Sequence, residues 1–136
     1  MPVAAARAAL LALALAALLL AQPAAAQAPA LPADTAALQA FRSGISNAND
    51  TVLVTWDDAL DPCGGTWVGV GCDCSQVPPS PTPCNNTDAS GNARVLGLNL
   101  GPVYQAATQK LQGSIAPAVG NLSALRYLDL SDNRLK

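Results

Sequence analysis

Apolar residues recur at a fixed spacing near the C-terminal end of the 136-residue chain. The spacing reads Leu125-x2-Leu128-x-Leu130-x2-Asn133-x-Leu135. Because side chains alternate between the two faces of a strand, Leu128 and Leu130 should face one side and the residues between them the other. The pattern predicts a short strand with its leucines in the core, followed by a turn at Asn133, whose amide should satisfy backbone groups there.

An earlier copy of this spacing begins at Val95. Its apolar positions, which precede those of the later copy by one constant offset, are Val95, Leu98 and Leu100. The next leucine, Leu111, precedes its counterpart by a smaller offset. We therefore expect a six-residue insertion within 101–110, which makes Gln109 the counterpart of the turn asparagine. An apolar strand and a turn asparagine that repeat together form the frame of a leucine-rich repeat.

Residues 1–26 have the order of a secretory signal peptide. Arg7 precedes an apolar run over 8–21, and small residues follow up to Ala26, after which we expect cleavage. The run is too short for an ordinary membrane span, and the alternative is an uncleaved signal anchor. Residues 27–33 are rich in proline and alanine, so we expect a disordered lead-in.

An amphipathic helix is predicted to follow. Asp34 can cap the free amides of the first turn, and Leu38, Phe41 and Ile45 then recur at spacings of three and four. The pattern ends near Asn47. This helix and the short apolar group after it would bury too little surface to fold alone, so they are predicted to cover another core.

Four cysteines occur behind the predicted secretion signal, and the chain contains no histidine. Their spacing lacks the Cys-x2-Cys pair of zinc modules, so two disulfides are expected rather than a metal site. A bond between Cys72 and Cys74 is disfavoured, because in extended chain their side chains point to the same side. The simplest pairing left is Cys63 with Cys72 and Cys74 with Cys84, which would close a proline-rich loop over 75–83.

The sequence resembles a known family over about 34–136. The cap motifs that carry the resemblance are Asp34-x2-Ala37-Leu38-x2-Phe41-Arg42-x2-Ile45, Trp56, Asp61-Pro62-Cys63 and Trp67-x-Gly69-Val70-x-Cys72. The repeat motifs are Gly113-Ser114-Ile115, Pro117 and Gly120-Asn121-Leu122. Together they resemble the N-terminal cap and first repeats of plant-type leucine-rich-repeat proteins. That family includes receptor-like kinase ectodomains, receptor-like proteins without kinases, and secreted polygalacturonase inhibitors.

The resemblance implies roles for the cap residues. Cys63 and Cys72 would form the cap disulfide, and Trp56 and Trp67 would pack the cap onto the first repeat. A carbohydrate-stacking role for either tryptophan is the alternative. The family cap usually lacks the proline-rich loop over 75–83, so its purpose is left open.

The expected fold class is an α/β solenoid: a disulfide-linked helical cap followed by incomplete leucine-rich repeats with short parallel strands. The expected parts are a signal peptide (1–26), a disordered lead-in (27–33), the cap with its loop (34–93), and the repeats (94–136), of which the second is incomplete. Since repeats stabilise one another by stacking, the chain is interpreted as an incomplete product or a fragment of a longer protein.

Charge and composition exclude several classes of function. Residues 27–136 carry six basic and nine acidic residues, a net charge of −3, which argues against a nucleic-acid partner. A histidine-dependent triad is excluded by composition, and no Gly-rich phosphate loop or metal-ligand cluster is present in the sequence. We expect no enzyme and no cofactor. A protein or peptide ligand is the first hypothesis, and a structural extracellular scaffold or secreted inhibitor is the alternative.

The predicted strands place a candidate partner surface between the leucines. Its residues are Asn99, Arg126, Tyr127, Asp129, Ser131 and Asp132. Candidate glycosylation sites, in Asn-x-Ser/Thr motifs, are Asn49, Asn85 and Asn121. We expect a secreted or extracellular location, or the outer side of the plasma membrane if the chain is part of a receptor. Membrane attachment would come only from further downstream sequence or from an uncleaved signal anchor.

Overall fold

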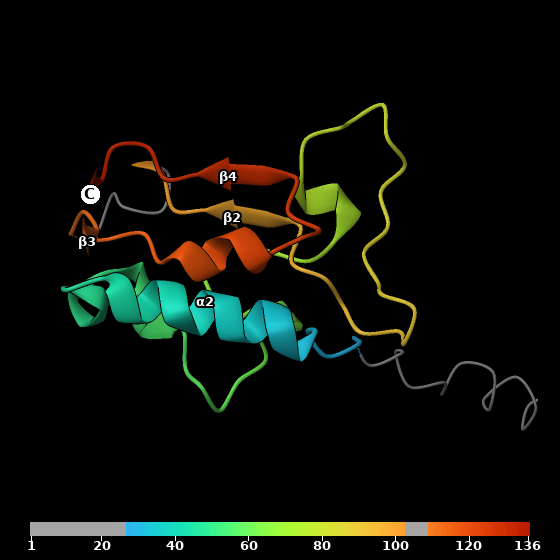
Figure 1. Cartoon of the computed structure of the whole chain (residues 1–136), viewed down its shortest axis with the longest axis horizontal. Coiled ribbons are helices and arrows are strands. Elements are labelled where there is room, and N and C mark those ends of the chain that lie inside the picture. Colours follow the sequence, from blue (N-terminus) through green and yellow to red (C-terminus); the bar gives the residue numbers. More distant parts are fainter. Residues whose placement is uncertain (1–26, 103–108) are drawn as a thin grey trace, which may run out of the picture.

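The computed structural model describes residues 27–102 and 109–136 (Figure 1). The predicted signal peptide and most of the predicted insertion lie outside these ranges. Within them, no helix has the length and apolar character needed to cross a membrane.

Among the described residues, one α-helix lies beside two small sheets (Figure 1). The helix is α2 (Pro32–Gly44), and the strands are β1 (Val70–Gly71), β2 (Gly97–Asn99), β3 (Gln112–Gly113), β4 (Tyr127–Asp129) and β5 (Arg134–Leu135). Single 3-10 turns connect them: η1 (Ala48–Asp50), η2 (Val52–Thr55), η3 (Pro62–Gly64), η4 (Cys74–Gln76) and η5 (Pro117–Asn121). Strands β1, β2 and β4 form one sheet in that order, and β3 pairs with β5. Helix α2 packs against η5 alongside the strands.

Strands β2 and β4 pair in parallel at the spacing that the apolar pattern predicts. Leu98 lies opposite Leu128, and Asn99 lies opposite Asp129. Both pairs keep the constant offset between the two copies of the pattern. The two copies therefore place their strands side by side, which is consistent with the start of a solenoid.

The second sheet corrects the predicted insertion. Gly113 lies opposite Leu135, so the predicted equivalence of Leu111 with Leu135 is wrong by two positions. The burial of the two leucines differs accordingly, since Leu111 is fully buried and Leu135 only half-buried. Leu111, rather than Gln109, takes the place opposite the turn asparagine, because its N–H donates to Asn133 Oδ1 at 2.8 Å. The insertion in the first copy, counted from its strand in the first sheet to its strand in the second, is therefore two residues longer than predicted.

Asn133 itself has the predicted structural role. Its Nδ2 donates to the carbonyl oxygens of Leu100 at 2.9 Å and Leu130 at 3.0 Å. The amide joins the turn of the second copy to the backbone of the first. Since these backbone groups lie at the ends of strands, the bonds hold the two copies in register.

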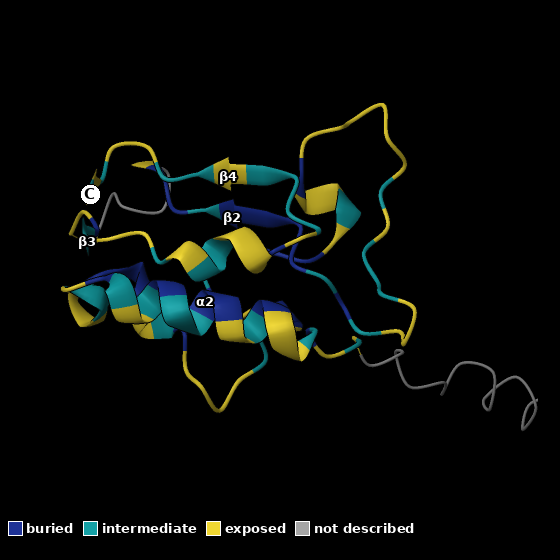
Figure 2. Cartoon of the chain, viewed as in Figure 1, coloured by how far each residue is buried: buried dark blue, intermediate teal, exposed yellow. Residues whose placement is uncertain are grey.

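The core lies between α2, η2 and strand β2 (Figure 2). Leu98 and Leu100 are fully buried, as predicted. Leu128 is not: its residue is 48% exposed, although Leu130 packs partly against the core. Because β4 is the outer strand of its sheet, none of the described elements covers Leu128. The prediction that all these leucines are core is wrong at this position.

The proline- and alanine-rich lead-in is ordered from Pro29 onward, which corrects the expectation of disorder over 27–33. Ala30 pairs with Ala93 in a parallel bridge. The N–H of Leu31 donates to Ala93 O, and the N–H of Ala93 donates to Pro29 O, both at 2.8 Å. Ala30 N also donates to Asp61 Oδ2 at 2.9 Å. Composition alone misses this segment because its partners lie far away in the sequence.

Gly69 is required by the approach of β1 to β2. Its φ is +86°, and a Cβ at this position would overlap the carbonyl oxygen of Asn99. We expect Gly69→Ala to lower the free energy of unfolding by at least about 1–3 kcal/mol, because both strain and overlap result. Urea unfolding measures the loss. Gly120→Ala is the control, since no atom lies within 4 Å of its added Cβ, and equal midpoints for the two variants would contradict the prediction.

Candidate functional site

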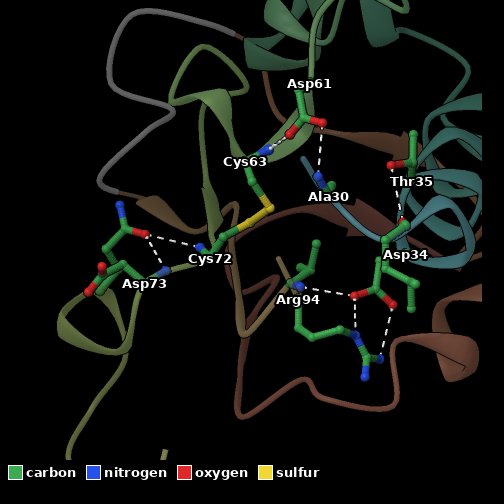
Figure 3. The surroundings of a disulfide bond; sticks show 11 residues. Ala30, Asp34, Thr35, Asp61, Cys63, Cys72, Asp73 and Arg94 are labelled. Atoms are coloured by element: carbon green, nitrogen blue, oxygen red, sulfur yellow. Dashed lines mark hydrogen bonds and ion pairs between the residues drawn. A yellow bond between two sulfur atoms is a disulfide. The ribbon is translucent and has the colours of Figure 1, made fainter. Parts of the chain in front are cut away.

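The cap is closed by a disulfide and by a pair of buried tryptophans. Cys63 is bonded to Cys72, the pairing that the family resemblance implies (Figure 3). Trp56 and Trp67 stack with their ring centroids 5.1 Å apart, and each is at most 2% exposed. Their indole N–H groups donate to backbone carbonyls. Because neither ring is exposed, the alternative of carbohydrate stacking on these tryptophans is wrong.

Asp34 ties the cap to the first repeat. It is fully buried, and its Oδ2 accepts from Arg94 Nε at 2.9 Å and from the Val95 N–H at 3.0 Å (Figure 3). Arg94 Nη2 also donates to Ser123 Oγ at 2.8 Å, and the hydrogen bond to Asp34 raises the pKa of the Arg94 guanidinium. The predicted capping role of Asp34 is therefore wrong. The helix begins at Pro32, with no side-chain cap, so Asp34 already lies within its first turn and faces the core.

Four of the predicted surface residues share one face of β2 and β4 or the turn after it: Asn99, Tyr127, Asp129 and Ser131. Asp129 Oδ1 accepts from the Ser131 hydroxyl at 2.6 Å and from its N–H at 2.9 Å. Tyr127 donates its hydroxyl to Asp129 Oδ2 at 3.3 Å. The carboxylate lies over Gly101, where an added Cβ would approach it to 2.7 Å. The absence of a side chain on Gly101 makes room for Asp129.

The electrostatics of this face follow from these hydrogen bonds. The Ser131 hydroxyl, followed by the Ser131 N–H, lowers the pKa of Asp129. Burial, together with the charge of Asp129, raises the pKa of Tyr127. At neutral pH the face therefore carries an ionised carboxylate beside a neutral tyrosine.

Arg126 and Asp132, the two charged residues predicted to flank this face, are engaged within the chain. Arg126 Nη2 donates to the carbonyl oxygen of Thr82 at 2.8 Å. Asp132 forms an ion pair with Lys110. Arg126 therefore holds the proline-rich loop against the repeats, and Asp132 holds the end of the predicted insertion.

The proline-rich loop borders the same face. A disulfide joins Cys74 to Cys84 across its base, and the loop extends beyond the ends of β2 and β4 (Figure 1). Val77 is buried, and its Cγ1 would lie 3.1 Å from a Cβ added to Gly97. The loop thus packs on the strand through Val77 and hydrogen-bonds through Thr82.

A hollow of about 260 Å³ lies between the loop and the sheet. It is lined by Gly69, Val70, Gly71, Gln76, Gly97, Asn99 and Tyr127. Sequence reasoning missed Gln76 and the glycine floor. The only signal for them was the recurrence of glycine in and beside the predicted strands, which by itself does not tell a hollow from a close approach of two backbones.

The three candidate glycosylation asparagines, Asn49, Asn85 and Asn121, are exposed. We expect N-glycans at these positions in protein secreted from eukaryotic cells, because the three acceptor asparagines are exposed. Peptide mapping by mass spectrometry after enzymatic deglycosylation in ¹⁸O-labelled water locates each glycan. Unmodified asparagine at all three positions would contradict the prediction.

The low pKa of Asp129 gives a pH prediction. A carboxyl whose pKa is depressed on folding stabilises the fold above its ordinary pKa, and this contribution is lost as pH falls through the lower, folded value. We expect Ser131→Ala to raise the Asp129 pKa toward its ordinary value of 3.8, since the hydroxyl that donates to the carboxylate is removed. NMR titration of the Asp129 carboxyl carbon measures it. Ser90→Ala is a control at another turn serine, and an unchanged Asp129 pKa in Ser131→Ala would contradict the assignment.

Comparison with known proteins agrees with this architecture. Residues 31–73 match the leucine rich repeat N-terminal domain family. A putative receptor-like protein kinase of Arabidopsis thaliana is 36% identical over 100 residues, which cover 74% of this chain and 7% of the relative. The LRR receptor-like serine/threonine-protein kinase EFR of the same plant is 36% identical over 101 residues, covering 74% and 8%.

Two further proteins are similar to this chain. The DNA damage-repair/toleration protein DRT100 of Arabidopsis thaliana is 35% identical over 103 residues, covering 74% of this chain and 24% of that protein. The solved leucine-rich-repeat ectodomain of the Arabidopsis thaliana receptor kinase SOBIR1 has a TM-score of 0.49 at 24% identity, over 79% of this chain and 45% of that chain. The chain thus spans only a small part of the curated relatives it matches. It belongs to the plant-type leucine-rich-repeat proteins and carries their N-terminal cap followed by the first repeats.

Proposed function

We propose that this chain forms the N-terminal end of an extracellular recognition surface that binds a protein or peptide ligand. The observation that carries the proposal is the parallel pairing of β2 with β4. It sets Asn99 directly beside Asp129, and Tyr127 and Ser131 continue the same row. In stacked repeats each added strand extends such a row of residues, so a ligand is bound along a surface rather than inside a deep pocket.

The chemistry of the row suits recognition. Asp129 supplies a fixed negative charge, because Ser131 holds one carboxylate oxygen and Tyr127 the other. A carboxylate that is already positioned loses little side-chain freedom when a ligand binds. We infer that the ligand presents a hydrogen-bond donor or a positive charge to this carboxylate.

The proposal also covers the location of the chain and its place in a longer protein. Four cysteines paired in two disulfides suit an oxidising compartment, which supports an extracellular location. The named relatives are much longer, and several are receptor-like kinases. We propose that this segment contributes binding and stability rather than catalysis, and that further repeats extend the face.

Ligand capture tests the proposal on the full-length secreted protein. Wild-type protein, Asp129→Ala and Val54→Ser would each be used to capture proteins and peptides from the extracellular fluid of the source tissue, followed by quantitative mass spectrometry. Val54 is the control because it is 59% exposed and lies on the cap. A ligand of this face should be depleted with Asp129→Ala alone, by about tenfold for a lost charge-assisted hydrogen bond.

Direct titration of the purified candidate ligand by calorimetry then checks the captured species. Equal affinity for wild type and Asp129→Ala would show that the ligand binds elsewhere. If no ligand is depleted with Asp129→Ala, the scaffold alternative is favoured instead.

A further inference from the structure

The hollow beside the proline-rich loop has the features of a small-ligand site. Its floor is made of glycine backbone, and its rim carries two side-chain amides and one aromatic residue: Gln76, Asn99 and Tyr127. At about 260 Å³ it lies just below the usual range for small-molecule sites, so it suits one unit of an oligomer rather than a large ligand.

The orientation of both amides is determined by their hydrogen bonds. Gln76 Oε1 accepts from the N–H groups of Cys72 at 3.0 Å and Asp73 at 2.9 Å. Asn99 Oδ1 accepts from the Gly101 N–H at 3.2 Å. Since each oxygen must face a donor, Gln76 Nε2 and Asn99 Nδ2 are left without a partner among the described residues. The rim therefore offers N–H donors.

An acceptor lies next to these donors. Tyr127 lines the hollow, and its hydroxyl donates to Asp129 Oδ2 at 3.3 Å, so the carboxylate marks the adjoining edge. No lysine or arginine is among the described residues that line the hollow. Arg126, the neighbouring cation in sequence, is engaged with Thr82. An anionic ligand would meet Asp129 without a compensating charge.

We propose that this hollow binds one residue of a neutral saccharide. Sugar hydroxyls both accept hydrogen bonds, as Gln76 and Asn99 require, and donate them, as Asp129 requires. The C–H face of a sugar ring can pack against an aromatic side chain such as Tyr127. The hollow adjoins the protein-ligand face and shares Asn99 and Tyr127 with it, whereas its glycine floor and Gln76 lie outside that face.

A peptide main chain fits the hollow less well. Peptides that add to a sheet need an edge with unpaired backbone groups. Beside the hollow, the carbonyls of Gly69 and Gly71 already accept from the N–H groups of Asn99 and Leu96, both at 2.8 Å. These two carbonyls are used where β1 meets β2, so they are not available to an added peptide strand.

Saturation-transfer NMR, which observes the ligand, tests the proposal on the full-length secreted protein. The probes are neutral hexasaccharides of β-linked glucose, xylose and mannose, with hexagalacturonate as the anionic comparison and a Gly-Ser hexapeptide as the peptide comparison. We expect at least one neutral hexasaccharide to show saturable transfer. If hexagalacturonate or the hexapeptide shows any saturation transfer, the neutral sugars should not displace it.

Variants locate the site. Gly97→Ala fills the floor, and its Cβ meets only the movable Cγ1 of Val77 within 3.4 Å. We expect it to weaken saccharide binding by about tenfold or more. Asn99→Ala removes one donor, should also weaken binding, and serves if Gly97→Ala fails to fold, while Val54→Ser should bind as wild type. Capture of the protein ligand should survive Gly97→Ala, which separates this test from that of the proposed function.

Three results would overturn the proposal. The first is the absence of transfer to any neutral hexasaccharide at millimolar concentration. The second is binding that is unchanged in both Gly97→Ala and Asn99→Ala. The third is preferential binding of hexagalacturonate or the hexapeptide with loss in the same variants, which would assign the hollow to that class instead.

Discussion

Replacing Asp34 with alanine is expected to lower the free energy of unfolding by about 3–5 kcal/mol, the range for breaking a buried ion pair from one side. The carboxylate is fully buried and holds Arg94 through two hydrogen bonds. Its loss would leave a guanidinium whose side chain is only 16% exposed without its counter-charge. The Val95 N–H, which donates to the same carboxylate, would also lose its acceptor.

Such a loss is comparable to the total stability of a small domain, so the cap should separate from the first repeat under mild denaturation. Urea unfolding of the full-length protein, followed by circular dichroism, measures the change. Asp50→Ala is the matched control, because Asp50 is exposed and its side chain has no hydrogen bond among the described residues. Equal midpoints for Asp34→Ala and Asp50→Ala would contradict the prediction.

A double variant separates the charge from the hydrogen bond. In Asp34→Asn with Arg94→Leu, the amide oxygen can still accept from the Val95 N–H, and no buried charge is left unpaired. We expect this pair to lose less stability than Asp34→Ala alone, because removing both charges avoids the largest cost. A greater loss in the double variant would show that the ion pair itself is strongly stabilising.

The second large effect is expected for Trp67→Ala, which should cost about 3–5 kcal/mol, as for other buried aromatic residues replaced by alanine. Trp67 stacks on Trp56, which in turn lies 6.0 Å from Phe41 between ring centroids. The Trp67 indole also donates to the Asp57 carbonyl at 3.2 Å. The substitution would remove the ring that joins the segment enclosed by the cap disulfide to η2 and α2.

Amide hydrogen exchange distinguishes local from global loss. Protection should fall in η2 and the C-terminal half of α2 before it falls in β2, since the stacked rings contact the cap. Trp67→Phe, which keeps an aromatic ring but removes the N–H, should lose less, and Val54→Ala at an exposed position should lose almost nothing. Uniform loss of protection across α2 and β2 would show that the tryptophan pair supports the whole fold rather than the cap.

Local spacing in the sequence determined the strand pairing, the turn and the disulfides of this protein. The constant offset between the two apolar patterns predicted the pairing of Leu98 with Leu128, because a repeated pattern of alternation favours the register that aligns equivalent leucines. The sequence also predicted the role of the turn asparagine, since an amide can bond to neighbouring backbone groups within one turn. The four cysteines lie close enough in the sequence for their spacing to favour the observed pairing.

Tertiary structure decided what depended on distant partners. Asp34 and Arg94 are 60 residues apart, and no local pattern distinguishes a buried aspartate near a helix start from a capping one. Arg126 is a charged residue of the kind expected on the surface, yet it donates a hydrogen bond to the carbonyl oxygen of Thr82, 44 residues earlier. The exposure of Leu128 depends on its strand being outermost, and the hollow depends on a disulfide loop folding over glycines. Such features arise from the packing of segments against one another, which periodicity along the chain does not encode.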